Sequence, residues 1–171
     1  MKLNTKSIAR AALIAAVYTA VCLALPFLSY GAIQIRFSEA LTLLPILMPE
    51  SVLGLTLGCF LTNLIGTFMG TTLPLDIFVG TLATFLAALT TRKLANVRIK
   101  GLPIAGMIPP VLFNAVFVGI ELTYLFANQF TAEIMLFNML TVGVGQLVAC
   151  ALGVILVWVI EKNDSLKKHF S

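Results

Sequence analysis

Long apolar stretches recur from one end of this sequence to the other, and they restrict the fold more than any other feature. Runs of about 18 or more apolar residues are long enough to cross the hydrocarbon core of a bilayer as helices. The mean hydropathy is +1.04, only 11% of the residues are charged, and no polar tract is long enough to form a soluble domain. We therefore expect an all-α integral membrane protein in which residues 1–171 form a single membrane-embedded domain.

Hydropathy and helix-breaking residues divide the chain into six predicted membrane helices. The first continues without a small-x-small cleavage site, so it is expected to be a retained helix and not a signal peptide. The second is short and contains Pro45 and Pro49, so it is expected to be tilted, broken or partly re-entrant against protein. The predicted spans are 8–28, 38–49, 51–69, 75–92, 103–126 and 131–160.

Basic residues are distributed unevenly over the loops that this division creates. With six spans, both termini lie on the same side of the membrane. Of the 11 Lys and Arg residues, all except Arg36 fall on that side. The positive-inside rule therefore predicts a multi-pass protein whose N and C termini are both cytoplasmic, with Arg36 in the first external loop.

Motifs for catalysis and for ATP hydrolysis are absent from the sequence. It has no G-x-x-x-x-G-K-[ST] loop, no H-E-x-x-H, no G-x-S-x-G and no cluster of Cys and His within a span. Two similar halves with matching broken helices, typical of secondary transporters, are also not seen. We expect no enzyme activity, no metal, no cofactor and no nucleic-acid partner. A membrane-embedded binding protein that obtains its energy from a partner fits best.

Polar side chains inside the predicted spans mark the candidate site, because each costs about 2–3 kcal/mol or more to insert into hydrocarbon. In the fifth span, Asn114, Phe117, Glu121 and Tyr124 are spaced three, four and three residues apart, which predicts one common helix face. Hydrogen bonds between helices would be enough to explain a single Asn or Gln side chain inside a span. A buried glutamate between a phenylalanine and a tyrosine favours a ligand site instead.

The outer half of the predicted bundle is acidic, with Glu39, Asp76, Glu121 and Glu133 against Arg36 alone. An Arg36–Glu39 ion pair would neutralise one carboxylate and orient the first external loop over the pocket. The other acids suit a cationic or donor-rich ligand, and nearby phenylalanines suit a flat ring. Further candidate site residues are the amides Asn63, Asn138 and Gln146.

Small residues at four-residue spacing form ridges on two predicted helices, and such ridges let membrane helices approach closely. The ridge of the third span is expected to pack inside the bundle. For the ridge of the first span, packing inside the bundle and docking of another membrane protein are both open. The ridges consist of Ala12, Ala16, Ala20 and Ala24, and of Gly54, Gly58, Thr62, Gly66 and Gly70.

Five stretches, spread over almost the whole chain, carry a family resemblance. They are "ARAALIAAVYTA" (9–20), "IQIRFSEALTLLP" (33–45), "PLDIFVGTLATFLAAL" (74–89), "PPVLFNAVFVGIEL" (109–122) and "VGVGQLVACALG" (142–153). In them the sequence resembles the QueT family of queuosine-precursor transporters, the substrate-binding S components of energy-coupling factor (ECF) importers of bacterial cell membranes. The second and fourth stretches are the most specific, because polar residues are fixed there inside apolar frames.

The resemblance implies a six-helix fold whose ligand site opens outward beneath the first loop. The implied ligand is 7-aminomethyl-7-deazaguanine or a related queuosine precursor, which has a flat base with a donor edge and a cationic arm. Glu121 and Glu39 are the residues expected to bind the base and the ammonium group, in either order. Asp76, Asn63, Asn114 and Asn138 are further candidates.

The resemblance also implies partners, namely a transmembrane coupling protein and two cytosolic ATPases that use the ATP. Ala12 and Ala16 are expected to contact the coupling protein, with Ala11 and Ala15 on a neighbouring face. One departure concerns Gln146, since members of the family often carry an acid there, which makes a neutral base more plausible. The alternatives are a stand-alone carrier for a small planar cationic metabolite or vitamin, and a membrane scaffold whose polar residues only join helices.

Overall fold

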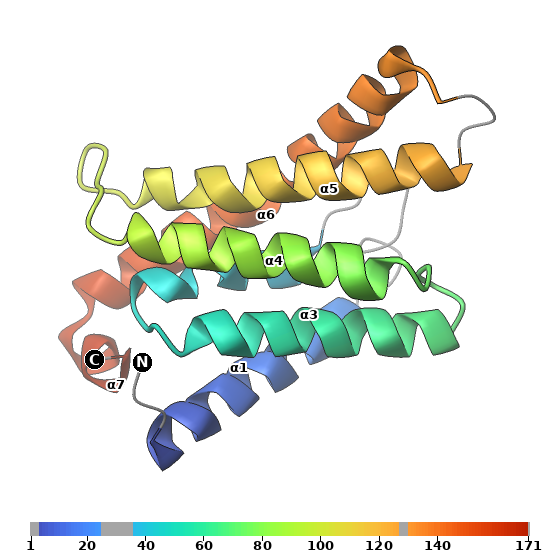
Figure 1. Ribbon diagram of the computed structural model, residues 1–171. Coiled ribbons are helices and arrows are strands. Elements are labelled where there is room, and N and C mark those ends of the chain that lie inside the picture. Colours follow the sequence, from blue (N-terminus) through green and yellow to red (C-terminus); the bar gives the residue numbers. More distant parts are fainter. Residues whose placement is uncertain (1–3, 25–35, 127–129, 171) are drawn as a thin grey trace.

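The computed structural model describes residues 4–24, 36–126 and 130–170. These residues form helices joined by turns, and among them the one extended pairing is an isolated bridge between Ile99 and Leu102. The all-helical prediction is therefore confirmed for the described part of the chain. Its elements are α1 (Thr5–Ala24), the 3-10 helix η1 (Phe37–Ile46), α3 (Ser51–Phe68), α4 (Asp76–Lys93), the 3-10 helix η2 (Ile104–Met107), α5 (Ile108–Phe126), α6 (Ala132–Lys162) and α7 (Asp164–Phe170) (Figure 1).

Four of the described helical segments are long and apolar enough to cross a membrane, namely α1, α3, α6 and η2 together with α5. This confirms the prediction of a membrane protein, while the count of six spans stays a prediction. The helix α4 also has 18 residues, but it begins with Asp76 and ends with Arg92 and Lys93. Residues 25–28 of the predicted first span lie outside the described residues.

The second predicted span is not an α-helix over 38–49 but a 3-10 helix of 10 residues that ends at Ile46. Proline has no backbone N–H and restricts the residue before it, so Pro45 and Pro49 prevent a regular α-helix from continuing here. The side chains of Leu43, Leu44 and Ile46 are buried in the bundle. The helix η1 is therefore a short apolar element buried within the bundle, in agreement with the expectation of a short, irregular second helix.

The helices pack in two layers (Figure 1). The helices α1, α3, α4 and α5 lie side by side in one layer, each in contact with the next, and η1 and α6 lie behind it. Apolar side chains from η1 and α6, among them Leu43, Cys150 and Val157, form one core cluster, against which residues of η2 and α5 pack. A second cluster joins α1 to α3 and η1.

The contact between α1 and α3 depends on glycines. A Cβ atom at Gly54 would lie 2.7 Å from the carbonyl oxygen of Ala11, and one at Gly58 would lie 2.9 Å from Cβ of Tyr18. Real Cβ atoms do not approach other atoms so closely. The two glycines therefore allow the backbones of α1 and α3 to approach, which confirms the predicted internal packing of this part of the α3 ridge.

We expect Gly54→Ala to lower the free energy of unfolding by about 1–3 kcal/mol, because the added methyl group forces α1 away from α3. The matched control is Gly143→Ala in α6, where the added Cβ would meet its nearest atom, Cβ of Ala115, at an ordinary 3.5 Å. That variant is expected to be neutral or stabilised by up to about 1 kcal/mol, since alanine favours helices. Thermal unfolding in detergent measures both, and equal midpoints would contradict the close contact.

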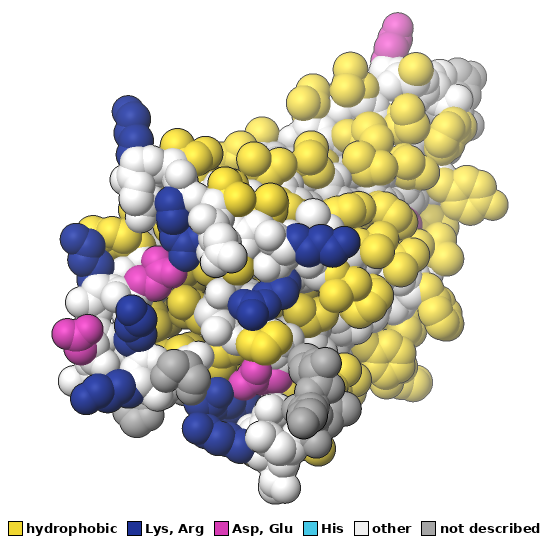
Figure 2. All heavy atoms as spheres, turned by 60° about the vertical axis from the view of Figure 1, so that its left-hand side comes forward, with side chains coloured by type: hydrophobic (Ala, Val, Ile, Leu, Met, Phe, Trp, Pro, Cys, Tyr) yellow, Lys and Arg dark blue, Asp and Glu magenta, His cyan; other side chains and the backbone are white. Residues whose placement is uncertain are grey.

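Basic residues gather at one end of the bundle (Figure 2), where both termini and the C-terminal ends of α4 and α6 lie (Figure 1). Three arginines there bind other elements. Arg10 Nη1 lies 3.0 Å from Glu50 Oε1, and Arg98 Nη2 lies 2.5 Å from Glu161 Oε1. Arg92 Nη1 donates to two backbone carbonyls at the end of η1, at 3.0 and 3.2 Å. The asymmetry of charge is thus present in the fold, and the cytoplasmic placement of this end stays a prediction.

Candidate ligand-binding site

A buried ion pair ties the beginning of η1 to the beginning of α4. Arg36, directly before η1, is 6% exposed, and its Nη2 lies 3.8 Å from Oδ2 of Asp76. Its Nη1 also donates to Oδ1 of Asn63 at 3.4 Å, and Nδ2 of Asn63 donates to the backbone carbonyl of Asp76 at 2.8 Å. A Cβ atom at Gly80 would lie 2.8 Å from Nδ2 of Asn63, so the glycine leaves room for the amide. Three predicted site residues, Arg36, Asn63 and Asp76, are therefore brought together.

Glu39 lies in η1 and is 1% exposed. Its Oε1 accepts a hydrogen bond from the hydroxyl of Tyr18 in α1, and its Oε2 has no hydrogen-bond partner among the described residues. The predicted Arg36–Glu39 ion pair is wrong, because Arg36 pairs with Asp76 instead. The reason is that Arg36 precedes the helix with an extended backbone (φ −85°, ψ 99°), so the one-turn helical spacing to Glu39 does not apply.

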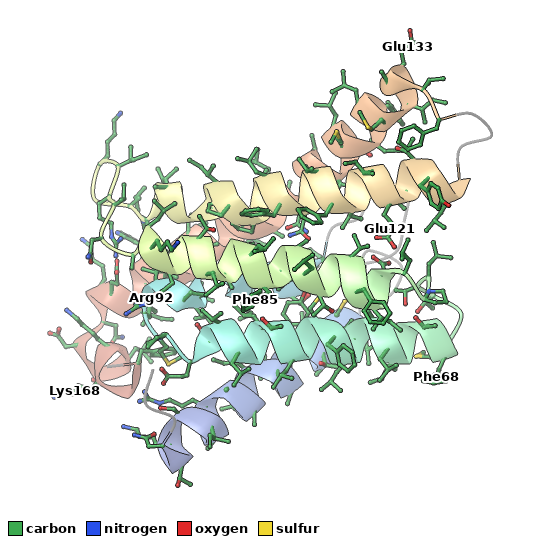
Figure 3. All side chains as sticks on the ribbon, in the orientation of Figure 1. Phe68, Phe85, Arg92, Glu121, Glu133 and Lys168 are labelled. Atoms are coloured by element: carbon green, nitrogen blue, oxygen red, sulfur yellow. The ribbon has the colours of Figure 1, made fainter. Side chains whose placement is uncertain are left out.

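Glu121 provides the third carboxylate of this region. It is 4% exposed and points from α5 toward α4 (Figure 3), within electrostatic reach of Asp76 and Arg36. In the part of the chain that the structure describes, no hydrogen-bond donor reaches either of its oxygens or Oδ1 of Asp76, and the two carboxyl groups lie close enough to share a proton. Buried carboxylate oxygens without partners are costly, so this arrangement is one that a ligand with several donors would satisfy. We call Glu39, Asp76, Glu121 and Arg36 the acidic cluster.

The predicted common face of α5 is only partly present. Asn114 and Glu121 are buried, whereas Tyr124 is 72% exposed. At about 100° per residue, the ten residues from Asn114 to Tyr124 leave these two side chains about 80° apart around the helix. Nδ2 of Asn114 donates to the backbone carbonyl of Pro110 at 3.0 Å, within its own helix. Phe117, Glu121 and Tyr124 together line an otherwise apolar groove of about 290 Å³ between α4 and α5.

The two amides predicted on α6 take part in other contacts. Nδ2 of Asn138 donates to Oγ1 of Thr123 at 3.0 Å, which links α6 to α5. Gln146 is buried, and its Oε1 lies 4.0 Å from Sγ of Cys150 one turn further along α6. These bonds fit interhelical and intrahelical packing, and no hydrogen bond between described residues joins either amide to the acidic cluster.

The four alanines predicted to dock a partner fall on two different faces of α1. Ala12 and Ala16 are exposed. Ala11 and Ala15 are 2% and 5% exposed, and their carbonyl oxygens lie against the glycines of α3. A docking partner can therefore reach Ala12 and Ala16, whereas Ala11 and Ala15 belong to the internal α1–α3 contact.

Three buried hydroxyl groups on Tyr18, Ser38 and Thr62 were not predicted from the sequence as part of a polar site. Tyr18 is fully buried and binds Glu39, and a tyrosine within an apolar span is itself a signal, because its hydroxyl needs a partner. Oγ of Ser38 and Oγ1 of Thr62 are buried without partners among the described residues, next in sequence to Glu39 and Asn63. Small hydroxyl residues are common in membrane helices, so no feature of the sequence distinguishes these two.

Apolar helices around a buried, acid-rich polar cluster define a membrane protein with a candidate polar binding site inside its bundle. The family model described as QueT transporter matches residues 8–162. The chain therefore belongs to the QueT transporter family, as the sequence resemblance implied, and this supports a transport role in the membrane and not an enzymatic one. No curated protein and no solved structure matches the chain significantly.

Proposed function

We propose that this chain is the substrate-binding subunit of an ATP-driven ECF-type importer and that it captures a queuosine precursor from outside the cell. The proposed ligand is 7-aminomethyl-7-deazaguanine or a closely related base. The observation that carries this proposal is the set of buried carboxylate oxygens on Glu39, Asp76 and Glu121 that no donor among the described residues reaches. Membership in the QueT transporter family supports it independently.

The chemistry of the proposed ligand complements the acidic cluster. Its guanine-like edge carries two adjacent donors, the N1–H and the exocyclic amine, which a single carboxylate can accept in a bidentate pair. Its aminomethyl arm is an ammonium group that a second carboxylate can bind. Arg36 already balances one acid, Asp76, by an ion pair. Glu121 and Glu39 are therefore the carboxylates proposed to meet the base and the ammonium group.

Calorimetric titration of the detergent-purified chain tests the ligand. We expect submicromolar binding of 7-aminomethyl-7-deazaguanine and no comparable heat with guanine or thiamine. The nitrile analogue keeps the base but lacks the ammonium group, so its affinity relative to that of the amine measures what the ammonium group contributes. Tight binding of the nitrile would agree with the expectation, drawn from the neutral Gln146, that a neutral base is bound. If none of these compounds binds, the proposed ligand is wrong, and other planar cations become the next candidates.

Energy for transport is proposed to come from a coupling protein and two cytosolic ATPases, because the chain has no nucleotide-binding motif of its own. The exposed ridge of Ala12 and Ala16 is the proposed contact with the coupling protein. Small residues at four-residue spacing allow a second helix to approach closely.

We expect the double change Ala12→Trp and Ala16→Trp to abolish uptake in cells that contain the ATPase module, while calorimetric binding of the ligand is unchanged. The reason is that both side chains point away from the bundle, so bulky groups there obstruct a partner and not the fold. Leu136→Trp, at an exposed position of α6, is the matched control. Unimpaired uptake by the double variant would instead favour a stand-alone carrier for a planar cationic metabolite.

A further inference from the structure

Two adjoining hollows lie at the cationic end of the bundle, and no residue of the acidic cluster lines either of them. The first is an apolar groove of about 390 Å³ between α1, η1 and α6, with Phe170 of α7 at its margin. The second hollow is lined by Lys6, Ala9, Arg10, Leu13 and Lys168. Arg10 and Leu13 belong to both, so the apolar groove leads directly to a basic rim. Apolar residues of the groove include Val17, Leu44, Met48, Leu156 and Ile160.

The basic rim brings together cations from two elements that are distant in sequence. Lys6 and Arg10 come from the first turns of α1, and Lys168 comes from α7. The guanidinium of Arg10 is fixed by Glu50, with Nη1 3.0 Å from Oε1, and Glu50 is itself buried. The described lining of this hollow has three basic side chains and no acidic one, so the rim presents positive charge to a ligand. An apolar groove with a positive rim complements a molecule that has an anionic head and a hydrocarbon tail.

We infer that this groove binds an anionic phospholipid, with one acyl chain between α1 and α6 and the phosphate held by Lys6, Arg10 and Lys168. The inference follows from charge complementarity and from the position of the groove in a membrane bundle. Basic pockets between helices at the positively charged end of a membrane protein favour anionic head groups over zwitterionic ones. Lipid chains are available at high local concentration along any groove that faces the bilayer.

The lipid groove adjoins the ridge proposed to contact the coupling protein. At about 100° per residue, Leu13 lies about 60° around α1 from Ala16, and Val17 lies about 140° from Ala12. Glu121 of the acidic cluster lies toward the other end of the bundle from Lys168 (Figure 3). Occupancy by a lipid can therefore be measured whether or not the chain binds a queuosine precursor.

The test is native mass spectrometry of the full chain in detergent, titrated with phosphatidylglycerol or with phosphatidylcholine of the same acyl chains. We expect phosphatidylglycerol to bind more tightly and the double change Lys6→Gln and Lys168→Gln to weaken it by about 10- to 30-fold. The control removes the same charge at the same end of the bundle through Lys93→Gln and Lys100→Gln, with an expected change of less than about two-fold. Val17→Trp, which fills the groove, is expected to weaken binding of both lipids.

Three results would overturn the inference. Equal affinity for the two lipids would show that the basic rim does not recognise the head group. An equal loss in the control pair would show attraction by overall charge and not a site. Displacement of phosphatidylglycerol by millimolar inorganic phosphate would show a site for free anions that does not use the groove. Unchanged thermal midpoints of the lipid-free variants establish that any loss of binding is not a loss of folding.

Discussion

Glu121→Gln is expected to weaken binding of 7-aminomethyl-7-deazaguanine by about 30- to 100-fold while the bundle stays folded. Glutamine has almost the same shape as glutamate, but it replaces a charged acceptor by a neutral amide that presents one donor toward the ligand. A hydrogen bond to a charged group contributes about 1.5–3 kcal/mol, which corresponds to this loss. No described donor reaches either carboxylate oxygen of Glu121, so both can accept from a ligand once any proton shared with Asp76 is released.

Calorimetry on the purified variant measures this loss, and thermal unfolding in detergent measures folding in parallel. Glu133→Gln is the matched control, because Glu133 is an exposed acid at the beginning of α6, away from the cluster. Binding by the control is expected to equal that of the wild type. Two results together would favour a membrane scaffold in which polar residues only join helices. These are that the wild-type chain binds no ligand and that Glu121→Gln unfolds more easily than the wild type.

Arg36→Gln is expected to produce the largest loss of stability, about 3–5 kcal/mol. Removal of one partner from a buried ion pair leaves the other charge without compensation. Here the remaining group is Asp76, whose Oδ2 lies 3.8 Å from Nη2 of Arg36, with the carboxylate of Glu121 nearby. Chemical unfolding in mixed micelles, compared with the wild type, measures the change in free energy.

A double-mutant cycle shows whether the loss belongs to the ion pair. Asp76→Asn removes the charge that Arg36 balances, so the double variant Arg36→Gln, Asp76→Asn is expected to be more stable than the sum of the single losses predicts. Strict additivity would contradict the pair. Arg98→Gln is the control, because its ion pair with Glu161 is partly exposed and such pairs contribute about 0–1 kcal/mol.

The sequence predicts the helical content and the membrane setting well because both depend on local composition. Apolar runs determine α1, α3, α5 and α6 almost regardless of how they pack. The region around η1 is different, since ten residues with two nearby prolines are consistent with a tilted, broken or re-entrant helix. Only packing against α6 and α4 decides among these, and packing is not a local property.

The candidate site is predictable in its charges but not in its pairings. A carboxylate within an apolar span must be explained, so Glu121 and Asp76 are visible from the sequence alone. The partner of Arg36 is not, because the extended backbone at Arg36 directs the guanidinium to α3 and α4 and not along η1. The separation of Ala11 from Ala12 likewise depends on which face of α1 meets the glycines of α3.

Three arginines at the end of the bundle where basic residues gather make contacts that affect how the orientation of the chain in the membrane can be determined. Orientation is commonly probed by exchanging basic residues for acidic ones and locating the termini with reporter fusions. At this end Arg10 and Arg98 hold acids on other elements, and Arg92 binds the carbonyls that end η1. Changing them would disturb assembly together with insertion, and a misfolded chain would resemble an inverted one. Lys93 and Lys100 are exposed, so substitutions at these lysines would report on insertion alone.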